Sequence, residues 1–93
     1  MIDADAHYRF PPARAYRLNR CLYALKSDAT FRGRYLSDPG AAMTELHLTV
    51  DEQAAVRAGD RDTLLGLGAH AYLVFMADLQ LRMAQGSTRF EYF

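Results

Sequence analysis

Three histidines and one cysteine are the residues of this chain best suited to bind a metal or act as nucleophiles. His7, His47 and His70 are scattered, and the patterns HxxxH and HExxH and a cysteine pair are all absent. An iron site of two histidines and one carboxylate can draw its ligands from distant segments, so spacing alone leaves that possibility open. We nevertheless expect no metal ligand, no cofactor-binding residue and no catalytic residue in this chain.

His70 has an unusual setting, the stretch GLGAHAYLVF that runs from Gly66 to Phe75. Each of its glycines weakens a helix by roughly 1 kcal/mol relative to alanine, which predicts a bend or a close backbone contact. Three interpretations of His70 remain: a core or bend residue hydrogen-bonded to a neighbouring carbonyl, a residue that faces a partner's pocket, or a metal ligand. The glycines are compatible with a bend residue. They also favour a residue that faces a partner's pocket, because they let another chain approach closely.

The remaining polar candidates fit structural roles better than catalytic ones. Cys21 falls on the apolar face of an expected helix, where a small buried thiol is far commoner than a nucleophile. Ser27, Ser37 and Ser87 stand near expected helix ends, and the phosphate-binding patterns GxGxxG and GKS/T are absent. The chain therefore lacks a recognisable catalytic set.

Composition indicates one small globular domain that spans residues 1–93. The chain is 51% hydrophobic and 24% charged, and its eleven basic and eleven acidic residues cancel, so we expect neither a nucleic acid nor a membrane as partner. The longest apolar run, AYLVFMA, is too short to cross a bilayer. A single cysteine and an N-terminus without a secretory signal favour a cytoplasmic protein.

Hydrophobic spacing predicts an all-α fold, a compact orthogonal bundle of five or six short helices. Leu18, Cys21, Leu22 and Leu25 repeat at i, i+3, i+4 and i+7, and no stretch alternates with period two. Helix starts are predicted at Asp28, at Asp38–Pro39, at the capping box Thr49–Glu52 and at Asp60, with Phe31, Tyr35 and Leu36 pointing inward. Helix ends are predicted near His47 and at Gly59.

The last predicted helix follows the glycine-rich bend and continues to about Ala84, where Gly86 and Ser87 end it. Residues 1–11 are expected to form an extended arm and residues 86–93 an aromatic tail. Because so short a chain cannot easily bury aromatic side chains at both ends, we expect some of them to pack against a partner. The candidates for partner-facing or pocket-lid positions are Gly68, His70, Tyr72, Phe90, Tyr92 and Phe93.

Four motifs in order resemble the small (alpha) subunit family of protocatechuate 4,5-dioxygenase, an extradiol aromatic-ring-opening enzyme. The family joins an NRxLYxL helix, a FLxDP turn, an LTxEE capping box and an LLxLGxHPYL stretch. The corresponding segments here are NRCLYAL from Asn19, YLSDP from Tyr35, LTVDE from Leu48 and LLGLGAHAYL from Leu64. The similarity covers about Tyr16 to Leu81, although Ala71 replaces the proline that usually follows the histidine.

This resemblance implies an all-helical, non-catalytic subunit that packs on a large (beta) subunit. The large subunit would carry the non-haem Fe(II) and the catalytic residues, and the small chain would help close the substrate pocket in the catabolism of catecholic aromatics. The alternative is a free-standing helical binding module for a small aromatic ligand or a peptide, a homo-oligomer that self-associates through its aromatic tails.

Overall fold

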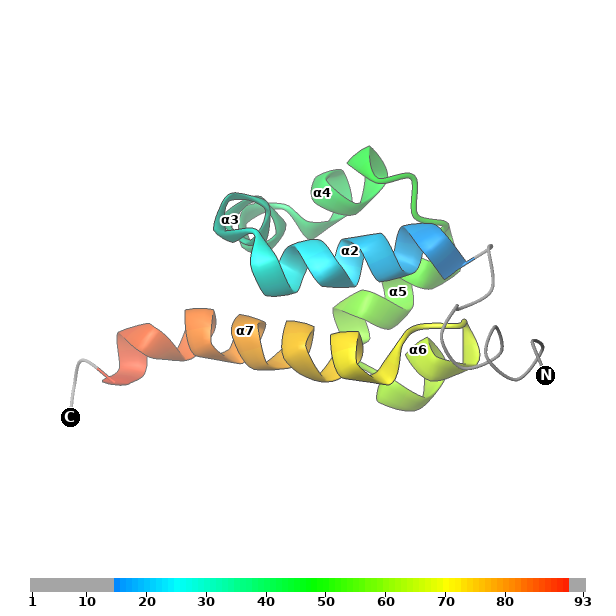
Figure 1. The fold of residues 1–93 in the computed structure, drawn as a ribbon. Helices are drawn as coiled ribbons and strands as arrows, with labels where there is room; N and C mark the ends of the chain where they lie inside the picture. The colour runs from blue at the N-terminus through cyan, green and yellow to red at the C-terminus, as the bar shows by residue number, and fades with distance from the viewer. Residues whose placement is uncertain (1–14, 91–93) are drawn as a thin grey trace.

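The computed structural model describes residues 15–90, with side chains from 15 to 85, and consists there of helices alone (Figure 1). The expected N-terminal arm lies outside the described residues. Tyr92 and Phe93 also lie outside them, and so does the side chain of Phe90. The helices are α2 (Tyr16–Ser27), α3 (Ala29–Ser37), α4 (Pro39–Glu45), α5 (Val50–Ala58), α6 (Arg61–Gly66) and α7 (Ala71–Phe90).

Helices α2 and α7 form the centre of the bundle. They lie side by side and parallel, and they share the most extensive contact between any two helices described (Figure 1). Helix α3 is seen end-on in this view and crosses them steeply, which agrees with the predicted orthogonal bundle. The C-terminal half of α7 continues past the other helices.

One hydrophobic core joins all six helices and the turns between them. The predicted face of α2 is fully buried, and Phe31, Tyr35 and Met43 close the core from α3 and α4. Leu36 was predicted to point inward as well, but it is 38% exposed, because the next helical position after Tyr35 turns away from α2. The core residues on the later helices are Ala55, Val56, Leu64, Val74 and Ala77.

The predicted helix starts are confirmed by hydrogen bonds from helix backbones to capping side chains. Asp28, Asp38 and Asp60 each accept a bond from the amide three residues ahead, at 3.1, 3.1 and 3.3 Å. Thr49 and Glu52 form the predicted capping box, in which each side chain accepts from the other residue's amide. Such a cap stabilises a helix by about 1 kcal/mol, because it satisfies amides that have no partner inside the helix.

The expected end of the last helix is wrong. Gly86 and Ser87 were predicted to end it after Ala84, with an aromatic tail from residue 86, but α7 runs on to Phe90. A glycine keeps its amide hydrogen and costs a helix only about 1 kcal/mol, whereas proline would remove the hydrogen bond. The helical residues on both sides of Gly86 therefore carry α7 through it.

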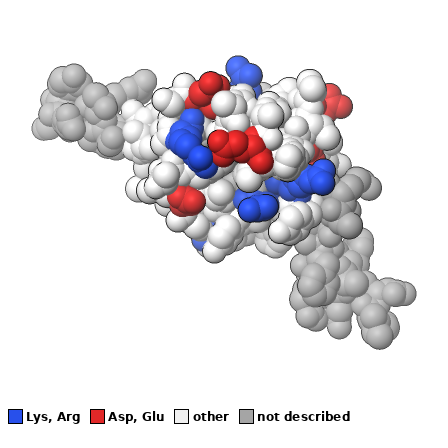
Figure 2. Space-filling model, turned by 90° about the horizontal axis from the view of Figure 1, so that it is seen from above, with Lys and Arg blue, Asp and Glu red and all other residues white. Residues whose placement is uncertain are grey.

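Charged side chains of both signs are scattered over the face formed by α2, α3 and α4 (Figure 2). Figure 2 shows Lys and Arg beside Asp and Glu on this face, without an extended patch of one sign. Arg34 on α3 and Glu45 on α4 form an ion pair at 3.1 Å. No helix in the described part of the chain is long and apolar enough to cross a membrane.

Candidate functional site

The glycine-rich stretch forms a sharp bend between α6 and α7. Helix α6 ends at Gly66, and Gly68 takes a φ of 103°, which a residue with a side chain rarely adopts. The amide of Ala69 donates a hydrogen bond to the carbonyl of Leu64 at 3.0 Å, and the Ala69 side chain is buried. The predicted bend is thus confirmed at Gly68, while Gly66 is helical and open, with space where a side chain would stand.

Asn19, on the first turns of α2, fastens this bend to the core. Its amide group donates to the carbonyls of Ala15 and Gly68, both at 3.1 Å. Its carbonyl oxygen accepts the amide hydrogen of His70 at 2.7 Å. One carboxamide therefore holds both sides of a bend that lies about fifty positions further along the chain, and the backbone of His70 is fixed relative to α2.

His70 is exposed and begins α7 as its capping residue. Its Nδ1 accepts the amide hydrogen of Tyr72 at 3.1 Å, and its carbonyl accepts that of Val74 at 3.0 Å. His70 lies at the bend, as the first interpretation expects, but its ring bonds to a backbone amide, and the expected carbonyl partner is wrong. Because Nδ1 is an acceptor, the neutral ring carries its proton on Nε2, and no hydrogen bond joins that N–H to a described residue.

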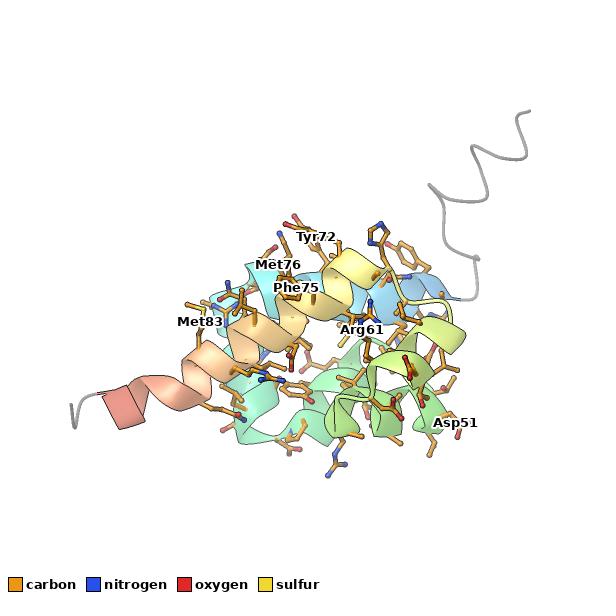
Figure 3. All side chains as sticks on the ribbon, turned by 90° about the horizontal axis from the view of Figure 1, so that it is seen from below. Asp51, Arg61, Tyr72, Phe75, Met76 and Met83 are labelled. Carbon is orange, nitrogen blue, oxygen red and sulfur yellow. The ribbon has the colours of Figure 1, made fainter. Side chains whose placement is uncertain are left out.

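Beside the bend, α7 exposes large apolar side chains along its outer side. Tyr72, Phe75, Leu79 and Met83 are 54%, 62%, 36% and 54% exposed. Met76 lies half-buried among them, and the labelled members follow the helix in Figure 3. These positions share one face at 100° per residue, opposite the face that packs on α2. We call these five residues the outer face of α7.

One cation lies at the edge of the outer face, on the α2 side. The Lys26 ammonium lies 5.4 Å from the ring centre of Tyr23 and 5.8 Å from that of Tyr72. Tyr23 is itself 57% exposed and extends the apolar surface onto α2. At this distance a cation is attracted to the ring face, by about 0.5–1 kcal/mol for exposed pairs. The contact links the α2 edge to the outer face.

Cys21 is completely buried in the core. Burial first, and then the nearby Glu52 carboxylate, raise the pKa of its thiol to about 12. A nucleophilic cysteine needs the thiolate near neutral pH, so Cys21 is a packing residue, as predicted.

The structure does not bring the histidines together. His47 lies exposed in the turn between α4 and α5, with a φ of 64°, His70 starts α7, and His7 is outside the described residues. Among residues 15–90, no group of three or more His, Cys, Asp or Glu side chains could hold a metal ion. The described residues therefore do not fit an iron site.

The comparison with protein families identifies the chain. Residues 18–87 match the family described as aromatic-ring-opening dioxygenase LigAB, LigA subunit. The chain belongs to this family. The match runs from the buried face of α2 through the bend and the outer face, and it confirms the resemblance noted from the four motifs. LigA is the small subunit of the LigAB dioxygenase, which implies a large-subunit partner. Neither the curated proteins nor the solved structures include a match to this chain.

Proposed function

We propose that this chain is the non-catalytic small subunit of an extradiol ring-opening dioxygenase. It packs on a large subunit that holds the non-haem Fe(II) and the catalytic residues, and it helps close that subunit's substrate pocket during catabolism of catecholic aromatics such as protocatechuate. Membership of the LigA family supports the kind of complex. The surface around the bend supports the manner of assembly.

The observation that carries the proposal is the outer face of α7. A helix with two apolar faces normally buries both of them, yet the described residues cover α7 only on the side that meets α2 and α6. Its outer face presents Phe75 and Tyr72 more than half exposed. Contiguous exposed apolar surface of this kind marks protein interfaces, where aromatic and methionine side chains are enriched. We infer that the large subunit covers this face.

The bend supports a role in closing the pocket. His70 stands two residues before Tyr72, so a partner that covers the outer face reaches the bend as well. Asn19 fixes the backbone here, and the Nε2 hydrogen of His70, which has no partner among residues 15–85, can bond to the partner or to a substrate. A rigid lid excludes water from a reaction that must protect reactive oxygen intermediates.

Co-expression with the large subunit tests the assembly. The wild-type chains should co-purify and cleave catechols, whereas the Phe75→Glu variant should lose co-purification by at least tenfold, because a carboxylate would be desolvated in the interface. Val50→Glu is the matched control. Val50 is 82% exposed on α5, and the substitution adds the same charge away from α7.

Three results would contradict this assignment. The first is full activity of the large subunit without the small one. The second is equal loss of co-purification for Phe75→Glu and Val50→Glu. The third is a stable homodimer of the small chain that keeps the outer face covered in the presence of the large subunit.

The role of His70 is tested separately with His70→Asn. Asparagine is among the best helix caps, so this variant keeps the start of α7 intact while it removes the ring nitrogen Nε2. We expect normal co-purification and at least a tenfold lower kcat/KM for ring cleavage. Unchanged kinetics would show that His70 acts only as a cap.

A further inference from the structure

A second apolar feature lies on the side of α7 that faces α2, α5 and α6, and Phe75 of the outer face forms part of its lining. A cavity of about 230 Å³ opens between α2, α7 and the junction of α5 with α6. Its floor consists of core side chains, Leu22, Leu25, Leu64 and Val74, all of which are at most 7% exposed. The family match assigns no role to this cavity, and Phe75 is the one lining residue that it shares with the proposed docking face.

The cavity has the size and the chemistry for one small apolar body. A cavity of about 150 Å³ lined by aliphatic side chains is enough to hold benzene, and drug-sized ligands occupy about 300–1,000 Å³. The present volume therefore suits a single six-membered ring with one substituent. The floor side chains carry no polar atom, so the buried part of an occupant must be apolar.

The rim of the cavity also carries one charged side chain, that of Arg61, which has no ionic partner among the described residues. Asp78 and Arg82 both line the rim, and they neutralise each other in an ion pair of 2.9 Å. Arg61 also lines the rim, and Figure 3 shows its side chain extending from the start of α6 towards α7. No hydrogen bond or ion pair joins the Arg61 side chain to any other described residue. A planar guanidinium at the mouth of an apolar cavity is suited to a carboxylate, which it binds through two parallel hydrogen bonds.

We propose that this cavity binds a compact apolar monocarboxylate of about the size of benzoate. The ring lies on the Leu25 and Val74 side chains, and the carboxylate pairs with the Arg61 guanidinium at the mouth. The proposal can be tested on this chain alone, because every residue that it uses belongs to this chain. It also differs from a ring-cleavage site, since the floor offers no partner for ring hydroxyls.

Titration of the full chain with benzoate, followed by amide-resolved nuclear magnetic resonance, tests the site. Millimolar benzoate should shift the amide signals of Leu25, Val74 and Arg61. Cyclohexanecarboxylate should bind comparably, while benzamide, which has the same shape without the charge, should bind at least tenfold more weakly. A benzoate with two ring hydroxyls should also bind more weakly than benzoate.

Variants at the mouth separate the charge from the cavity. Arg61→Gln should weaken benzoate binding about tenfold or more, and Arg61→Lys should weaken it less, because it keeps the charge without the planar fork. Arg20→Gln removes an exposed arginine of α2 that does not line the cavity, and it should leave the affinity within twofold. Because Arg61 is exposed, these variants are expected to fold, and circular dichroism verifies this.

Three results would overturn the proposal. The first is an absence of shifts at the floor residues on titration. The second is that benzoate and benzamide bind the wild type with equal affinity, or that the wild type and Arg61→Gln bind benzoate with equal affinity. The third is a set of Overhauser contacts, without any ligand, between the floor methyl groups and side chains of residues 86–93, which would mean that the chain fills its own cavity.

Discussion

The carboxamide of Asn19 makes three hydrogen bonds as a set, because it offers two donors and one acceptor in a fixed plane. Two of its partners belong to the bend before α7. Asn19 is therefore the residue on which the position of the bend depends most directly.

Asn19→Ala should lower the free energy of unfolding by about 1–3 kcal/mol, since it leaves partly buried backbone groups without partners. Asn19→Asp should cost at least as much, because a carboxylate would face the carbonyls of Ala15 and Gly68. Urea unfolding measures both. Gln80→Ala, a half-buried amide side chain on α7 for which the structure gives no hydrogen bond, is the control and should change stability by less than about 0.5 kcal/mol. A loss for Asn19→Ala no larger than the control's would contradict this account.

Two glycines should respond to alanine with opposite signs. Gly59 ends α5 with a φ of 66°, and alanine there should destabilise the protein by about 1 kcal/mol, although nothing occupies the space beside it. Gly33 is helical within α3 and equally open, so alanine should stabilise by up to about 1 kcal/mol. Thermal unfolding of both variants gives the comparison. A shift of the same sign in both would show that backbone conformation is not the cause.

The buried thiol predicts how stability depends on pH. The pKa of Cys21 is raised from 9.0 to about 12 in the folded protein, so above pH 9 the unfolded chain loses this proton while the folded chain keeps it. Stability should therefore fall as pH rises from 9 to about 12, by up to about 1.4 kcal/mol per pH unit. Burial also raises the pKa of Tyr35, which acts in the same direction. Urea midpoints across this range measure the slope, and Cys21→Ala should reduce it. An unchanged slope would exclude Cys21 as its source.

Helix α7 shows most clearly how far the sequence alone can predict the elements. The capping side chains identified helix starts from local chemistry, which involves only residues three positions apart. Helical spacing puts Tyr72, Phe75, Met76, Leu79 and Met83 on one face of α7, but it does not reveal that this face points to solvent. Residues 73, 74, 77 and 81 provide a second apolar face, and only the packing on α2 decides which of the two is buried.

Neighbouring residues on the two faces of α7 should therefore respond differently to the same charge. Phe75→Glu alters the exposed face, and in the isolated chain it should change the free energy of unfolding by less than about 0.5–1 kcal/mol. Val74→Glu places the carboxylate in the core and should unfold the protein or cost several kcal/mol. Circular dichroism with urea distinguishes them. Severe destabilisation by Phe75→Glu would mean that the outer face is part of the fold rather than an interface.

Across the whole bundle, the class of fold and the family follow from the sequence, because the helix starts, the apolar spacing and the order of four motifs are all local features. The hydrogen bonds of Asn19 could not be predicted from the sequence. Its place in the NRxLYxL motif marked the position, but its partners lie at Gly68 and His70 and come near only when the bundle is assembled. The cavity beside Arg61 likewise depends on three elements that meet only in the folded chain.

The parallel pairing of α2 with α7 has a consequence for the order of events on the ribosome. The apolar face of α2 leaves the ribosome early, but α7, the helix that covers it most extensively, is synthesised about fifty residues later. Closing a loop over that distance has an entropic cost. Until then the nascent segment has an incomplete core and must avoid wrong associations. Productive folding of this protein should begin only after α7 has left the exit tunnel.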